Sequence, residues 1–277
     1  MANSAYTSGF NTDALFVPAK AATVYAAHES SLFLGGQIVP VINAPNGVLQ
    51  VPELAAVSAT KITSEAAPGV DIDSVLPADT KNTISANLYA ARSVVRDLGN
   101  IDPQEIGRVL GNSVSASFDA DVAGVMGSLT GQEIASGDLD MAEVAAAVAT
   151  IRGAGETGPL YGVVSTNAYA ALMNDIGGTA FAGGEQFQGA AMRSGFFGTL
   201  MGVQVFVSSY LNDSNTGVTG SKMAIFSQDA MRIGMQKNVD LEVARRAEAV
   251  GFDVVASLHA GVGLIDAGRG VLIKDAA

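Results

Sequence analysis

The hydrophobic pattern of this 277-residue chain changes its period several times, and its longest strict alternation lies near the end. From Phe252 to Leu264 every second residue is apolar, while the residues between them, including His259, are mostly polar or small. A period of two held this long predicts a β-strand longer than most. Residues 239–250 are predicted to be its antiparallel partner, and a turn with a short strand follows over 267–276.

A helical period begins at Pro103. Asp102 supplies an N-cap, Pro103 the first helical position and Glu105 the third, which together form a helix start signal. Apolar residues then recur at steps of four: Ile106, Leu110, Val114, Phe118 and Val122. This pattern predicts a helix that ends near residue 129 and is roughly 40 Å long. Its small residues Gly111, Ser113 and Ser117 are expected to permit close packing.

Two segments near the N-terminus carry little apolar pattern of their own. Residues 1–46 are rich in Ala, Ser, Thr and Asn, and we predict an extended arm with one short helix around 19–28. Residues 47–54 and 82–91 are predicted to form two strands joined by a long connection, of a length that is usually functional or disordered. Because an isolated two-stranded ribbon is marginal in water, both segments need a neighbouring surface.

Helical and strand patterns alternate over residues 138–236, which predicts a mixed sheet with helices packed on it. The predicted helices are 140–155, with Asp140 as N-cap and Gly153 as the stop, and 166–178. Strands are predicted at 159–165, 202–211 and 222–236. Residues 177–189 are predicted to form a glycine-rich linker.

Composition narrows the function classes. Charged residues make up 15% of the chain, below the roughly 25% of typical soluble domains, so we expect much of the surface to be covered by self-association. The net charge of −12 argues against nucleic-acid binding through a basic face. The absence of cysteine excludes disulfides and thiol catalysis and fits a reducing cytoplasm. No apolar run reaches the roughly 18 to 20 residues of a membrane span, and a secretory signal is not supported.

No chemical motif supports an enzyme. A Ser-His-Asp hydrolase would need a nucleophile elbow, which the chain lacks, and only His28 and His259 could act as the imidazole base. His259 is interpreted as a structural rung of the long strand. Asp71, Asp73 and Asp79 lack the glycine and glutamate of a calcium loop and are interpreted as solvated loop charges. No catalytic residue, cofactor or metal is therefore predicted.

Five stretches carry a resemblance through their order along the chain. They are "LQVPEL" with "ITSEAAPGVDID" (49–73), residues 91–129, "YGVVSTNAYAALMND" (161–175), "GTLMGVQVFVSSYL" (198–211) and residues 242–273. In this order they resemble the tailed-bacteriophage major capsid proteins of the HK97 fold. Their local sequences resemble those of the coat proteins of short-tailed podophages. Each stretch is a pattern of packing residues and does not carry a catalytic or ligand-binding motif.

The resemblance implies an α+β, HK97-like capsid fold in four parts. These are an N-terminal arm (1–46), an extended β-ribbon loop (47–92), a peripheral domain with a long spine helix (93–136 and 241–260) and an axial α/β domain (137–240 and 261–277). It also implies a major capsid protein that forms hexamers and pentamers in an icosahedral shell. That shell, assembled in the host cytoplasm, encloses double-stranded DNA without sequence-specific binding and without a membrane. A separate scaffolding protein and a portal are the expected further partners.

Charged residues of the ribbon and two arginine pairs are the expected subunit-interface residues. They are Glu53, Lys61, Glu65, Asp71, Asp73, Lys81, Arg92, Arg96, Arg245 and Arg246. Covalent cross-linking between subunits is not supported, because only the lysines Lys61 and Lys81 can be assigned. An encapsulin-type nanocompartment shell and a surface-layer or fibre protein remain alternatives to the phage capsid.

Overall fold

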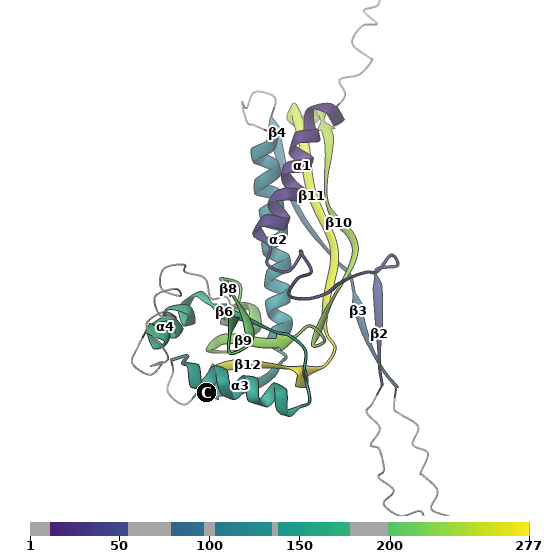
Figure 1. Cartoon of the computed structure of the whole chain (residues 1–277). Helices are drawn as coiled ribbons and strands as arrows, with labels where there is room; N and C mark the ends of the chain where they lie inside the picture. The colour runs from purple at the N-terminus through teal and green to yellow at the C-terminus, as the bar shows by residue number, and fades with distance from the viewer. Residues whose placement is uncertain (1–11, 55–78, 97–102, 135–137, 178–198, 277) are drawn as a thin grey trace, which may run out of the picture.

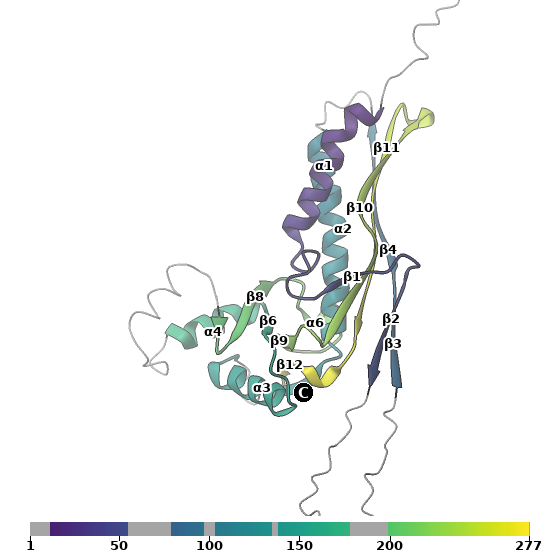
Figure 2. The same cartoon turned by 45° about the vertical axis from the view of Figure 1, so that its right-hand side comes forward.

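The structure is a computed structural model that describes residues 12–54, 79–96, 103–134, 138–177 and 199–276 (Figure 1). An elongated body combines two helices with a four-stranded sheet. A second body, built on a six-stranded sheet, lies at one end of it, and a two-stranded ribbon projects at the side (Figures 1 and 2). The predicted α+β class is confirmed.

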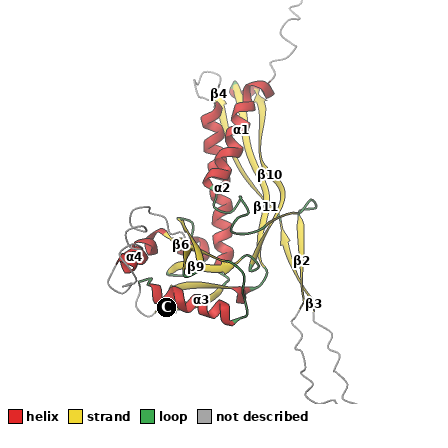
Figure 3. Cartoon of the chain, viewed as in Figure 1, coloured by secondary structure: helices red, strands yellow, loops and turns green. Residues whose placement is uncertain are grey.

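Helices and strands alternate irregularly along the chain (Figure 3). The described helices are α1 (Thr12–Ser30), α2 (Pro103–Met126), α3 (Met141–Gly153), α4 (Thr166–Gly177) and α6 (Asp213–Thr216), with 3-10 turns at Ala247–Ala249 and Ala267–Arg269. The described strands are β1 (Val41–Asn43), β2 (Val48–Leu54), β3 (Asp79–Ser85), β4 (Asn87–Arg96), β5 (Thr130–Ile134), β6 (Leu160–Ser165), β7 (Thr199–Leu200), β8 (Val203–Ser208), β9 (Ser221–Ser227), β10 (Met231–Arg246), β11 (Gly251–Leu264) and β12 (Gly270–Asp275).

The four-stranded sheet has the order β1-β10-β11-β4, and its centre is the long antiparallel β10–β11 hairpin. The alternation predicted for β11 is confirmed, because Val254, Ala256, Leu258 and Ala260 are fully buried in one core with the apolar residues of α2. Figure 2 shows α1 and α2 on one face of this sheet. His259 lies on the other side of β11, a half-buried rung of the ladder as predicted.

The long helix α2 starts at Pro103 as predicted and ends at Met126, about three residues before the predicted end. α6 packs closely against the residue that follows the helix. A Cβ on Gly127 would lie 2.1 Å from the carbonyl oxygen of Thr216, so this position has no room for a side chain. Asp102, the predicted N-cap, lies outside the described residues.

The predicted short helix of the arm is longer in the structure. α1 extends from Thr12 to Ser30 and lies along α2 (Figure 1). Its contact side is made of small residues, with Ala19, Thr23 and Ala27 almost completely buried. These residues gave no clear helical period in the sequence because alanine and threonine become core residues only against a closely packed neighbour.

Glycines of α2 allow this close packing. A Cβ on Gly107 or Gly111 would lie 2.4 Å from a backbone oxygen of α1, so the two helices approach each other more closely than side chains would permit. The expectation for Gly111 is confirmed, but that for Ser113 and Ser117 is wrong, because both serines are exposed. Ser115 makes the contact instead, with its hydroxyl 2.6 Å from that of Ser30.

The six-stranded sheet has the order β5-β12-β9-β6-β8-β7 and packs with α3 and α4. Asp140 caps α3 as predicted, accepting a 2.9 Å hydrogen bond from the amide of Glu143. The segment 222–236, predicted as strand, is divided between the two sheets: β9 belongs to the six-stranded sheet and β10 to the four-stranded sheet. Of the predicted glycine-rich linker, residues 178–189 lie outside the described residues.

Candidate assembly surfaces

Four of the predicted interface residues come together at the free end of the long sheet. Arg245 and Arg246 end β10, and the register of β11 places Arg96 opposite Gly251 and Arg92 opposite Val255. Two arginine pairs that are about 150 positions apart in the sequence therefore share one tip. We call the end of β4, β10 and β11 with these four arginines the arginine tip.

Within the described residues, Arg92, Arg245 and Arg246 each contact a side chain of their own chain. Arg92 forms a two-pronged ion pair with Asp253 and thereby holds the pKa of that carboxyl below its usual value. The Arg245 guanidinium carbon lies 4.7 Å from the ring centre of Phe252, a cation–π contact. The Arg246 Nη2 atom is 3.9 Å from the Glu248 carboxylate. All four arginines are nevertheless exposed, so a contact with a second copy stays a prediction.

A strained apolar residue completes the arginine tip. Val250 has φ 46° and is 62% exposed at the turn between β10 and β11. A β-branched residue is rarely found in this left-handed conformation, where glycine or asparagine is favoured. Sequence analysis missed Val250, because a valine beside a glycine gives no sign of its backbone angles.

β2 and β3 form the predicted antiparallel ribbon, with Pro52 opposite Lys81 and Glu53 opposite Thr80. The return strand predicted at 82–91 is wrong in its second half, because residues 87–91 belong to β4, which pairs with β11 in the four-stranded sheet. Lys81 is exposed on it. The side chain of Glu53 is not described, and four predicted interface residues lie outside the described residues: Lys61, Glu65, Asp71 and Asp73. Figures 1 and 2 show the ribbon at the side of the β10–β11 hairpin, separate from the six-stranded body.

The root of the ribbon rests on glycines of the β10–β11 hairpin. A Cβ on Gly261 would lie 2.1 Å from the carbonyl oxygen of Ser85, and one on Gly263 would lie 2.5 Å from the side chain of Ile84. The Asn82 amide also donates a 2.9 Å hydrogen bond to the carbonyl of Ile265. The small residues on the second face of β11 are therefore the seat of the ribbon, a role that the strand pattern did not indicate.

The outward face of α1 is a second apolar surface that sequence analysis missed. A shallow hollow of about 660 Å³ is lined by Val17, Lys20, Ala21, Val24, Tyr25 and His28. Val17 is 60% and Tyr25 68% exposed. Lys20 is held by Asp240 at 2.5 Å. Exposed apolar area of this kind is typical of surfaces that become covered by a partner.

The predicted candidate side chains for metal and acid–base chemistry lie apart from one another in the described residues. Within them, no group of three or more His, Asp or Glu side chains is placed to hold a metal ion. His28 lies on α1 with its Nε2 atom 3.3 Å from the Asn238 amide, whereas His259 lies on β11. A polar hollow of about 490 Å³ near the end of β6 contains the Lys222–Asp275 ion pair, at 3.2 Å. No helix of the described chain is long and apolar enough to cross a membrane.

The arrangement of these parts defines a class of fold. A long helix beside a long-stranded sheet, a second sheet at its end, an N-terminal helix and a projecting ribbon together form the HK97-like fold of phage capsid proteins. The HK97-like fold expected from the resemblance is confirmed. No protein-family model and no curated protein matches the chain.

Solved structures of capsids share this fold. The capsid of the native GTA particle has a TM-score of 0.66 and 15% identity, covering 87% of this chain and 89% of that one. The capsid of Cyanophage P-SCSP1u has a TM-score of 0.64 and 16% identity over 86% of both chains. A virus-like particle from Pyrococcus furiosus has a TM-score of 0.63 and 12% identity, with coverage of 94% and 99%.

Proposed function

We propose that this chain is the major capsid protein of a tailed bacteriophage, a structural subunit with no enzymatic activity. Copies form hexamers and pentamers in an icosahedral shell that encloses double-stranded DNA. The single observation that carries this proposal is the HK97-like fold shared with several phage capsids. The projecting ribbon, the arginine tip and the apolar face of α1 support it, because each gains a partner when copies tile against one another.

Charge complementarity supports a contact between the ribbon and the arginine tip. Residues 62–80, which comprise part of the connection between β2 and β3 and the first two residues of β3, contain Glu65, Asp71, Asp73 and Asp79 and no lysine or arginine. We propose that this acidic segment of one copy meets the arginine tip of another. Complementary charges of this kind fix the register and suppress wrong contacts.

The remaining partners follow from the shell. We propose a separate scaffolding protein and a portal, assembly in the host cytoplasm and a final location in the virion. The net charge of −12 supports an inner wall that does not hold DNA electrostatically.

The four-part division of the chain also remains a proposal. If the two sheets define the peripheral and axial domains, the chain passes from one domain to the other at 228–230 and at 265–269. These connections lie near the boundaries predicted from the sequence, after residues 240 and 260, but do not coincide with them.

The encapsulin-type shell and the surface-layer or fibre protein receive less support. The similarity to solved structures of phage and GTA capsids favours the phage capsid. An encapsulin would share the fold, so the contents of purified particles distinguish the two: packaged DNA supports the capsid and a packaged enzyme supports the nanocompartment.

Negative-stain microscopy of the full chain, expressed alone and with its scaffolding protein, tests the proposal. We expect closed shells tens of nanometres across. The double variant R96E/R246E should abolish shells and leave the melting temperature unchanged, because these exposed side chains contribute little to the fold. Arg108, exposed on α2, provides the matched control R108E, which should assemble normally. A monomer under every condition would contradict the proposal.

A further inference from the structure

Two strand connections cross side by side from one sheet to the other. In the four-stranded sheet the β10–β11 ladder ends at the pair Met231 and Leu264, and in the six-stranded sheet the β9–β12 ladder begins at Phe226 and Gly270. The chain between the strands, 228–230 on one side and 265–269 on the other, belongs to neither sheet. A change of angle between the two bodies would act first on these residues.

The two connections share one backbone acceptor. The carbonyl oxygen of Ala230 accepts hydrogen bonds from the amides of Ile265, at 2.8 Å, and Asp266, at 3.2 Å. Two connections tied at a single backbone oxygen can act as a hinge, because a small rotation at this point breaks no hydrogen bond of either ladder. Such a rotation would have to be accommodated by the core that Phe226 and Leu272 share with α2 and the long hairpin.

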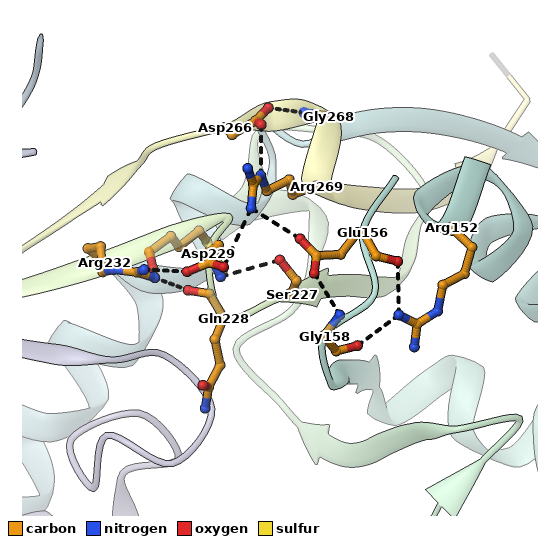
Figure 4. Close-up of polar contacts among 11 residues, drawn as sticks. Arg152, Glu156, Gly158, Ser227, Gln228, Asp229, Arg232, Asp266, Gly268 and Arg269 are labelled. Atoms are coloured by element: carbon orange, nitrogen blue, oxygen red, sulfur yellow. Dashed lines mark hydrogen bonds and ion pairs between the residues drawn. The ribbon is translucent and has the colours of Figure 1, made fainter. Parts of the chain in front are cut away.

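Arg269 joins three carboxylates around this point (Figure 4). Its Nε atom lies 3.0 Å from Asp266, and its Nη1 atom lies 3.2 Å from Glu156 and 3.4 Å from Asp229. Asp229 belongs to the first connection, Asp266 to the second, and Glu156 to the loop between α3 and β6 of the six-stranded body.

The network is anchored in both bodies. Glu156 is only 9% exposed, and its other oxygen accepts a 2.8 Å hydrogen bond from the Gly158 amide. Arg152 on α3 donates to the carbonyls of Glu156 and Gly158, at 2.9 and 2.8 Å. On the opposite side, Asp229 pairs with Arg232 of β10 at 2.5 Å. The contacts thus run from the loop after α3, through Arg269, to the first residues of the long sheet (Figure 4).

We infer that Arg269 clamps a hinge between the two bodies of this chain. With the guanidinium in place, Asp229, Asp266 and Glu156 are held to one another and the two bodies keep a fixed angle. Without it, three carboxylates repel each other at the crossing, while the two hydrogen bonds to Ala230 and the core shared by the two sheets remain. The clamp belongs to a single chain and stands whether or not copies assemble.

Amide hydrogen exchange on the unassembled full-length chain tests the clamp. In R269A the amides of Ile265 and Asp266 should exchange about tenfold faster or more, while the ladder amides of Leu258 and Ile225 keep their protection. R108A, which removes an exposed arginine far from the crossing, is the matched control and should change none of them. R269K should be intermediate, because an ammonium cannot reproduce the forked contacts of a guanidinium.

A salt series on the wild-type chain tests the same inference without a mutation. Raising the ionic strength screens the attractions in the wild type and the repulsion among the three carboxylates in R269A. Exchange at Ile265 should therefore accelerate in the wild type and stay unchanged or slow in R269A. Unchanged protection of Ile265 in R269A would overturn the clamp. So would an equal loss at Ile265, Leu258 and Ile225, since that would show general destabilisation and no hinge.

Discussion

The carboxylate of Asp119, on α2, accepts a 2.6 Å hydrogen bond from the hydroxyl of Ser31, which directly follows α1. Its second oxygen accepts from the amide of Leu32 at 3.1 Å. The Ser31 hydroxyl in turn accepts from the amides of Phe33 and Leu34. Asp119 is 1% exposed, and this burial raises its pKa to about 6, although the two hydrogen bonds act in the opposite direction.

Asp119 should make the chain more stable at mildly acidic than at neutral pH. The folded state holds the proton more tightly than the unfolded state, so the contribution is complete below the ordinary value of 3.8 and is lost as the pH rises through about 6. A shift of this size corresponds to roughly 3 kcal/mol. Asp240 and Asp253, whose pKa values are lowered, act only at more acidic pH, where their stabilisation is lost as the pH falls.

Denaturant unfolding at a series of pH values measures the effect. The free energy of unfolding of the wild type should fall between about pH 4 and pH 7, and D119N should remove most of that slope because an amide does not titrate there. Asp138, exposed before α3, provides the control D138N, which leaves Asp119 intact and should keep the wild-type slope. An unchanged slope in D119N would show that Asp119 does not cause it.

Replacing a glycine between α1 and α2 even by alanine should destabilise the fold. Alanine at an exposed helix position normally stabilises by up to about 1 kcal/mol relative to glycine. At Gly111, however, the new Cβ would lie 2.4 Å from the Thr23 carbonyl oxygen, so G111A should destabilise the chain by about 1 to 3 kcal/mol. Gly153 ends α3 with no atom within 4 Å of its Cβ position, so G153A should be neutral or stabilising. Thermal or denaturant melting of both variants compares them directly.

A side chain at Gly261 should weaken the contact between the β2–β3 ribbon and β11 without unfolding the rest of the chain. In G261A the added Cβ would lie 2.1 Å from the Ser85 carbonyl oxygen, and backbone cannot rotate away as a side chain can. We expect amide protection to fall in β2 and β3 and to persist in β9. Gly131, on the edge strand β5, meets only the flexible end of Lys274 at 3.4 Å, so G131A is the matched control. Equal exchange of β3 in the two variants would contradict the seat.

Elements with a strong local period could be predicted from the sequence. The long strand around Leu258 and the spine helix around Phe118 show their apolar positions at constant spacing, and Asp140 caps a helix by contacts within four residues. These features depend on neighbours along the chain. The class of fold followed from their order.

Features that depend on distant contacts could not be predicted. Nothing in the sequence places Arg96 beside Arg246, because the register of three strands decides it. The interface role assigned to Arg92 also overlooked Asp253 of the same chain, more than 150 residues away. The glycine seat was interpreted as an ordinary small face of the strand, since the ribbon that covers Gly261 belongs to a different part of the chain.

Val250 should lower the stability of the single chain and strengthen contacts between copies. Its left-handed backbone costs of order 1 kcal/mol, which V250N should recover, because asparagine tolerates this conformation. V250T keeps the branching at Cβ, and thus the strain, but replaces an exposed methyl by a hydroxyl. If the arginine tip contacts another copy, both variants should form fewer shells, whereas only V250N should melt at a higher temperature. Fewer shells with V250N alone would instead point to the turn conformation as the feature that assembly requires, and normal shells with both would show that the apolar side chain has no partner.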